Sequence, residues 1–205
     1  MSMRRQLLIA TRNKGKLMEY EQLLTGLSIS LTDLSAQGIT NGVEETGHTF
    51  RENAVHKARE YARISGLPTL ADDSGLEVDA LGGEPGIHSA RYAGVGATDQ
   101  DRCQLLLERL ADVPWEERTA RFRCVIAVAQ PGGEAYSSEG VCEGVIALAP
   151  QGEYGFGYDP IFFLPEHAKT MAQLAPGVKN RISHRARAAQ GMARILLEVV
   201  GGNDV

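Results

Sequence analysis

The sequence is poor in cysteine, and its three cysteines (Cys103, Cys124 and Cys142) are widely spaced and form no Cys-x-x-Cys pair. An odd number of isolated cysteines argues against a disulfide framework and against a cysteine-rich zinc site, and it predicts a reduced, cytoplasmic setting. The five histidines likewise form no His-x-His or His-Glu-x-x-His pattern. We therefore expect any metal ion to take oxygen ligands, which favours magnesium or manganese.

The chain also lacks an excess of positive charge and lacks long apolar runs. Its formal net charge of −5 argues against non-specific binding to nucleic acids or to anionic lipids. The apolar stretch 195–200 is far too short to span a bilayer, and the first residues contain no sustained apolar segment typical of a signal peptide. Without repeats, linkers or low-complexity segments, residues 1–205 are expected to form one domain, or two lobes that share a core.

The densest group of reactive side chains follows an apolar lead-in at residues 67–71, which predicts a short buried strand. This strand is expected to end on the adjacent carboxylates Asp72 and Asp73. Burying an unpaired carboxylate is costly, so solvent, a cationic side chain or a metal ion must compensate. Ser74 and Gly75 then predict a tight turn. The same tetrapeptide is also typical of an ordinary strand-to-turn exit, so by itself it leaves an active site and a plain turn equally open.

Residues 11–16, Thr-Arg-Asn-Lys-Gly-Lys, lie between a predicted strand at 6–10 and a helix whose apolar residues Leu17, Tyr20 and Leu24 recur at helical spacing. A loop that leads into a helix N-terminus offers backbone N–H groups and a favourable dipole to an anion. The segment resembles a P-loop, but the leading glycine is missing and Leu17 stands where Ser or Thr would bind magnesium. Phosphate binding and a plain basic helix start both remain open.

Periodicity predicts further strands and helices along the chain. The expected strands are 28–34, 122–129, 135–141 and 144–149, and helices are expected to start at Thr49, near Thr98 and after Ser183, with a frayed tail at 201–205. Thr49 and Glu52 form a capping-box pattern.

Polar residues at three places in this pattern are candidates for binding. Asn53 and Lys57 lie four residues apart, so they share a helix face that differs from the apolar stripe. The preceding loop carries Glu44 and Glu45, which are solvated in most such loops. The last helix has His184 and Arg185 in its first turn, where cations oppose the helix dipole unless an anion or acceptor is near.

Glycines alternate with aromatic residues in 155–160, Gly-Phe-Gly-Tyr-Asp-Pro. This pattern suits a flat ligand that stacks beside a closely approaching backbone. An ordinary aromatic turn is an equally good interpretation of these residues alone.

Taken together, four separated motifs resemble the inosine triphosphate pyrophosphatase family, whose bacterial members are XTP/dITP diphosphatases. The motifs are Thr11-x-Asn13-x-x-Lys16, residues 44–47 with 52–57, residues 72–76, and residues 156–160 with 183–185. The resemblance covers about residues 7–197, with the motifs in the family's order. It implies an α/β protein of two lobes, with a long mixed central sheet flanked by helices and a cleft between the lobes. It also implies a homodimer that acts on a small-molecule purine nucleoside triphosphate.

The resemblance further implies magnesium-dependent hydrolysis of ITP, dITP and XTP to the monophosphate and pyrophosphate. Glu45 and Asp73 are expected to bind magnesium, with Asp73 as the general base for water. The expected substrate-binding residues are Thr11, Asn13, Gly15, Lys16, Ser74, Phe156, Gly157, Tyr158, Asp159, Lys179, His184 and Arg185. Family members place the last two at the purine six-position, where a donor-only guanidinium suits a 6-oxo group and leaves the amino group of adenine unpaired.

The residue chemistry agrees with this expectation, because lysines and a divalent cation neutralise a triphosphate. One departure is Arg12, where many relatives have glycine; it either stiffens the phosphate loop or adds a cation to it. A phosphotransferase with a degenerate P-loop is a poor alternative because the Walker features are missing. A non-catalytic nucleotide sensor is the alternative from another class, although a sensor has no need for Asp73 together with a second acid at Glu45.

Overall fold

The computed structural model describes residues 5–201, and the chain divides into two compact units. The first unit contains the chain up to Asp73, residues 124–140, and the chain from Arg185 onward. The second unit contains residues 74–123 and 141–184. The tail predicted to fray lies outside the described residues from 202 onward. No helix within the described residues is long and apolar enough to cross a bilayer.

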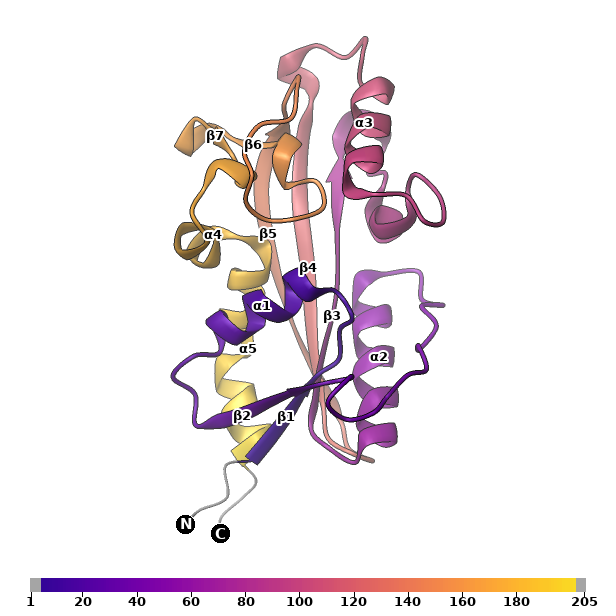
Figure 1. The fold of residues 1–205 in the computed structure, drawn as a ribbon, viewed down its shortest axis with the longest axis vertical. Coiled ribbons are helices and arrows are strands. Elements are labelled where there is room, and N and C mark those ends of the chain that lie inside the picture. Colours follow the sequence, from indigo (N-terminus) through magenta and orange to yellow (C-terminus); the bar gives the residue numbers. More distant parts are fainter. Residues whose placement is uncertain (1–4, 202–205) are drawn as a thin grey trace. The chain divides into compact units, whose positions relative to one another are not determined.

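One mixed sheet contains seven strands in the order β2-β1-β3-β4-β5-β6-β7 (Figure 1). β1 pairs in parallel with β2 and with β3, whereas β6 is antiparallel to both β5 and β7. The strands are β1 (Arg5–Ile9), β2 (Ile29–Asp33), β3 (Thr69–Val78), β4 (Thr119–Ala129), β5 (Ala135–Ile146), β6 (Phe162–Leu164) and β7 (Lys169–Thr170). A mixed sheet flanked by helices confirms the predicted α/β class.

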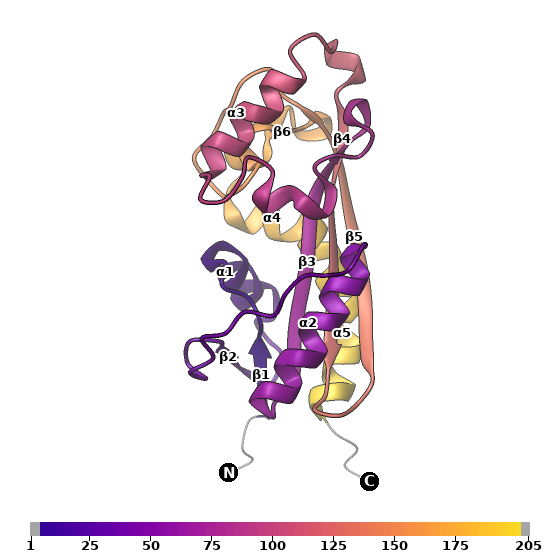
Figure 2. The same ribbon diagram turned by 90° about the vertical axis from the view of Figure 1, so that its right-hand side faces the viewer.

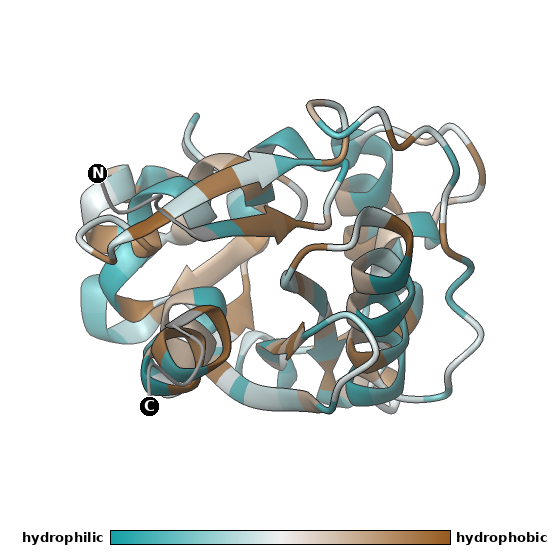
Figure 3. Cartoon of the chain, turned by 90° about the horizontal axis from the view of Figure 1, so that it is seen from below, coloured by the Kyte–Doolittle hydropathy of each residue, from teal (hydrophilic) through white to brown (hydrophobic). Residues whose placement is uncertain are grey.

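Helices cover both faces of the strands in the first unit. α1 (Lys14–Leu23) and α5 (His184–Gly201) share an apolar cluster with Leu7, Ile9 and Leu70, which lie on one face of β1 and β3. α2 (Phe50–Ser65) lies on the other side of these strands (Figures 1 and 2). α5 is amphipathic, with hydrophobic and hydrophilic residues around its circumference (Figure 3). Because side chains alternate along a strand, neighbouring residues of β3 face different helices.

The second unit has its own apolar core. Residues of α3 (Asp99–Arg109), such as Leu106, pack with Phe122 of β4 and with Phe162 of β6. α4 (Pro176–Ile182) and several short 3-10 helices complete the unit. The predicted start of α3 is confirmed, since Thr98 caps it with Asp101 in a reciprocal capping box.

Three local predictions need correction. β3 does not end at Asp73 and Ser74-Gly75 does not turn; the strand continues to Val78, because Leu76 and Val78 are buried in the second core. The segments 135–141 and 144–149 are not separate strands, since β5 runs unbroken from Ala135 to Ile146. The capping pattern of α2 is only half formed. Thr49 accepts from the Glu52 N–H at 3.1 Å, but the Glu52 carboxylate accepts from the His48 N–H at 2.7 Å.

Candidate active site

The strand β3 presents its two adjacent carboxylates to opposite sides of the first unit. Asp72 has the same orientation as Leu70, toward α1 and α5, whereas Asp73 points toward α2. Both residues are buried, at 3% and 6% relative exposure. One dipeptide therefore supplies two acids with different partners.

Asp73 is held by two residues of α2 and lies near an acidic loop. The Asn53 amide donates to Asp73 Oδ2 at 2.9 Å. The ammonium of Lys57 lies 3.8 Å from Asp73 Oδ1 and 2.5 Å from Glu45 Oε1. Burial raises the pKa of Asp73, and Glu45 adds to this, although Lys57 and Asn53 oppose it. The pKa of Lys57 is raised. Burial alone would lower this pKa, but the negative charges of Asp73, Asp72 and Glu45 outweigh the effect of burial.

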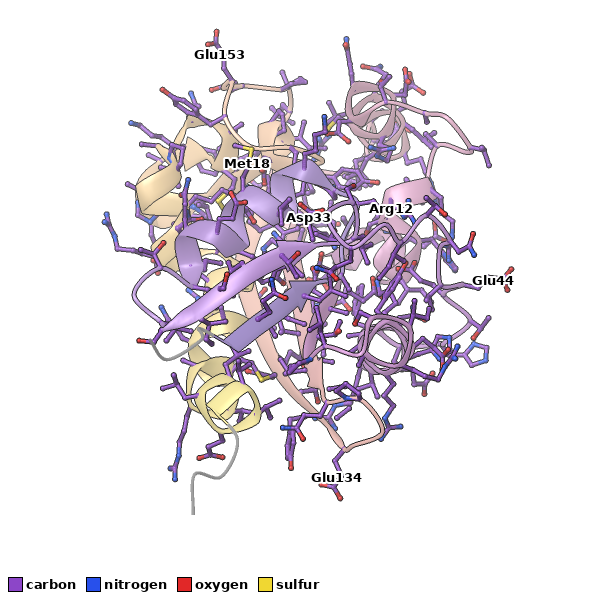
Figure 4. The ribbon with its side chains drawn as sticks, turned by 60° about the horizontal axis from the view of Figure 1, so that its bottom comes forward. Arg12, Met18, Asp33, Glu44, Glu134 and Glu153 are labelled. Atoms are coloured by element: carbon purple, nitrogen blue, oxygen red, sulfur yellow. The ribbon has the colours of Figure 1, made fainter. Side chains whose placement is uncertain are left out.

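The pair formed by Glu45 and Asp73 fits a magnesium ion. Within residues 5–201, no cluster of three or more His, Cys, Asp or Glu side chains is arranged to hold a metal by itself. Magnesium, however, uses one or two carboxylates and takes further oxygens from substrate phosphates. Both carboxylates lie within ion-pair distance of one ammonium group, so a single positive charge can interact with the two of them. Glu44 is exposed and points away from the ribbon (Figure 4), as expected of a solvated loop glutamate.

Asp72 is the centre of a second, more deeply buried network. Lys16 Nζ lies 2.9 Å from Asp72 Oδ2, and Arg185 Nη2 lies 3.3 Å from the same oxygen. Arg185 also pairs with Glu19, and its guanidinium lies over the ring of Tyr20, 5.8 Å from the centroid. Burial would raise the pKa of Asp72, but Lys16, Arg185 and Lys57 together hold that pKa well below its usual range. Arg185, in the first turn of α5, therefore has the acidic partners Asp72 and Glu19, which offset its unfavourable interaction with the helix dipole.

Residues 11–16 are ordered by their own side chains. Asn13 caps α1, with its Oδ1 accepting from the Lys16 N–H at 3.1 Å, and Thr11 Oγ1 accepts from the Asn13 N–H at 3.2 Å. Arg12 donates to the Thr40 carbonyl at 2.6 Å. Of the two roles considered for Arg12, these contacts favour restraint of the loop, because the guanidinium is tied to the backbone of residues 39–40.

In the second unit, a buried ion pair fixes residues 155–160, which are called the aromatic loop below. Lys179 Nζ lies 2.5 Å from Asp159 Oδ2, and the same carboxylate oxygen accepts from the Phe156 N–H at 2.9 Å. The Lys179 ammonium lies 4.7 Å from the centroid of the Phe156 ring. Gly155 has φ +80°, and a Cβ there would lie 2.0 Å from the Asp159 carboxylate, so glycine is required.

Other predicted residues of this unit are also tied to its core. The Gly157 N–H donates to Asp99 Oδ2 at 2.7 Å, and the Tyr158 hydroxyl donates to the Ser89 carbonyl at 2.9 Å. The His184 ring stacks on Phe122, with centroids 4.8 Å apart. Ser74 lies on β3, directly after Asp73, and is half-buried.

The structure thus gathers the predicted residues into two groups. Lys16, Glu45 and Asp73 lie in the first unit, and the aromatic loop with Lys179 lies in the second. Their contacts with substrate or metal stay predictions. Sequence reasoning assigned no role to Glu19; it expected a compensating partner for Asp72 but did not identify Lys16 and Arg185 as that partner. It recognised the shared face of Asn53 and Lys57 but did not connect it to Asp73, although the spacing of four was the available signal.

Comparisons with known proteins identify the family. The family model described as Ham1 family matches residues 7–195. A protein of Geobacillus kaustophilus named dITP/XTP pyrophosphatase is 50% identical over 198 residues, covering 97% of each chain. A Bacillus subtilis protein of the same name is 47% identical over 192 residues, covering 94% of this chain and 97% of its own. The solved structure of a HAM1 protein from Coxiella burnetii has a TM-score of 0.85 at 44% identity, covering 95% of this chain and 99% of that one. The chain therefore belongs to the Ham1 family, which confirms the family resemblance carried by its four motifs.

Proposed function

We propose that this protein hydrolyses the non-canonical purine nucleoside triphosphates XTP, dITP and ITP to the monophosphate and pyrophosphate, with magnesium as cofactor. The names of relatives about 50% identical over nearly the whole chain support the reaction. The observation that carries the proposal is the set of side chains around Asp73. A buried carboxylate lies beside a lysine that also contacts a second carboxylate, Glu45.

The first unit supplies the groups for the triphosphate. Lys16 and Lys57 neutralise phosphate charge, and Thr11, Asn13 and Gly15 are the proposed further contacts of residues 11–16 with the phosphates. Glu45 and Asp73 would hold the magnesium ion, which would supply positive charge to the phosphates and to the attacking water. Asp73 accepts the proton of the attacking water.

Residues 155–159 and Lys179 are the proposed binding groups for the nucleoside. Phe156 offers a ring face for stacking the purine, and the Asp159–Lys179 pair fixes the loop that carries this ring. Ser74, Gly157, Tyr158, His184 and Arg185 are the remaining proposed contacts for sugar and base. We also propose a cytoplasmic homodimer with no nucleic-acid polymer as partner.

The test is incubation of the protein with ITP and magnesium, followed by identification of the products. Inosine monophosphate and pyrophosphate are expected; orthophosphate would indicate a phosphatase, and binding without turnover would indicate a nucleotide sensor. Asp73→Asn is expected to abolish turnover. The matched control is Asp112→Asn, because Asp112 is an exposed aspartate in the second unit and is expected to leave turnover unchanged.

A further inference from the structure

A buried asparagine, Asn53, connects Asp73 with the loop that carries Glu45. Its side chain is fully buried on α2. Its Nδ2 donates to Asp73 Oδ2 at 2.9 Å, and its Oδ1 accepts from the Gly47 N–H at 2.8 Å. We propose that Asn53 is a positioning residue, which sets Glu45 and Asp73 at the separation needed to bind one divalent cation. The proposal rests on the proposed function only in taking these two carboxylates as the metal ligands.

The chemistry of the side chain suits this task. An amide carries its donor and its acceptor on two separate atoms and has no charge, so it can bridge two different partners. An aspartate would have no proton to donate to Asp73 at neutral pH, and a leucine would leave both partners unsatisfied in a buried place. The two partners also determine the orientation of the amide, since its NH2 group must face the carboxylate and its oxygen the Gly47 N–H.

Gly47 shows that the contact between loop and amide is close. A Cβ at Gly47 would lie 2.7 Å from Asn53 Oδ1 and 2.7 Å from the Glu52 Cβ. Atoms at that separation clash, and the Glu52 Cβ belongs to the rigid first turn of α2. A side chain at position 47 would therefore push the loop away from Asn53, two residues after Glu45.

Lys57 also contacts both carboxylates, but its contribution changes when a metal binds. Its ammonium lies 2.5 Å from Glu45 and 3.8 Å from Asp73, so it neutralises the pair and competes with any arriving cation. The amide of Asn53 is neutral, and a divalent cation does not repel it. The Asn53 connection is therefore the one that persists when the ion is bound.

A different residue of α2 holds the same loop without touching Asp73. The Val43 N–H donates to the Tyr61 hydroxyl at 3.2 Å, two residues before Glu45. Tyr61→Phe removes this hydrogen bond and keeps the ring. It therefore weakens the attachment of the loop at Val43 and leaves the hydrogen bond between Gly47 and Asn53 in place. It is the matched control that separates general loop order from the specific connection to Asp73.

The experiment measures binding of Mn2+ alone to the nucleotide-free protein, by electron paramagnetic resonance, for the parent and three variants. Loss of a residue that orients a metal ligand typically costs about 10- to 100-fold in metal affinity. We expect Asn53→Ala and Gly47→Ala to weaken Mn2+ binding by about this factor, and Tyr61→Phe to stay within about threefold of the parent. Hydrogen exchange at the Gly47 amide should accelerate in Asn53→Ala. Because Gly47 lies in a loop, Gly47→Ala tests the proposal even if Asn53→Ala fails to fold.

Three results overturn the proposal: parent-like Mn2+ affinity in Gly47→Ala and in folded Asn53→Ala, an equal loss in Tyr61→Phe, or no Mn2+ binding by the parent. The proposed function fails separately. If ITP is not hydrolysed but Mn2+ binding changes as expected, Asn53 is still the positioning residue and only the reaction is wrong.

Discussion

Replacing Arg185 by alanine tests the buried network around Asp72. The Arg185 side chain is 1% exposed and pairs with Glu19 and Asp72. The variant leaves Glu19 buried without this cation, and leaves Asp72 with Lys16 as its nearest positive charge. Removing one partner of a buried ion pair costs about 3–5 kcal/mol because the remaining charge stays desolvated.

The expected loss of stability is large enough to measure by thermal unfolding. For a chain of this length, 1 kcal/mol corresponds to about 2–4 °C in Tm, so Arg185→Ala should lower Tm by about 6–20 °C. The control is Arg194→Ala on the same helix. The Arg194 side chain is 91% exposed and pairs with Glu198 at 3.1 Å. An exposed pair of this spacing contributes about 0.3–0.5 kcal/mol, or about 1–2 °C.

The effect should also depend on pH. The cations around Asp72 hold its pKa below the usual range. The stability gained from them is therefore present above the ordinary carboxyl pKa of about 3.9, and it is lost as the pH falls below that value. The difference in unfolding free energy between parent and Arg185→Ala should accordingly be greatest at neutral pH and smaller near about pH 3.

A Tm for Arg185→Ala within about 1 °C of the parent would refute this reasoning, since the guanidinium would then contribute nothing to the buried carboxylates. The predicted contact of Arg185 with the purine has its own test. ITP and XTP are expected to be hydrolysed far better than ATP, by roughly 10⁴-fold where hydrogen bonds discriminate. An ITP-to-ATP ratio of kcat/KM that does not change in the variant, measured below its Tm, contradicts the base contact.

Three further predictions concern the first unit. Asp73→Asn should lower kcat by at least about 10²–10⁴-fold with a native circular dichroism spectrum, because the general base is lost; retention of a tenth of the activity would assign the role elsewhere. Lys16→Ala should raise the KM for ITP and lower turnover, and unchanged kinetic constants would leave residues 11–16 as a plain helix start. Arg12→Gly should accelerate hydrogen exchange in residues 39–40, since it removes the donor to the Thr40 carbonyl; unchanged exchange there would show that Arg12 does not restrain the loop.

Local sequence signals were sufficient for most of the elements and for the family. Apolar periodicity predicted β1, α1, β2 and α2, and Thr49 and Thr98 marked helix starts, because caps and periodicity depend on residues a few positions apart. The four motifs were sufficient to assign the family, since each consists of neighbouring residues. The end of β3 was predicted at Asp73 because Ser and Gly usually form turns. The prediction was wrong because burial of Leu76 and Val78 in a core built from distant segments outweighs that local preference.

The partners of the charged groups were decided by tertiary structure alone. Arg185 pairs with Glu19, 166 positions away, and no local pattern links the two residues. Asp72 and Asp73 are chemically identical neighbours, yet they have different partners and opposite pKa shifts because strand alternation turns one toward α1 and α5 and the other toward α2. The sequence determines that alternation. Which cationic side chain lies on each face of the strand depends on how helices distant in the chain pack against the sheet.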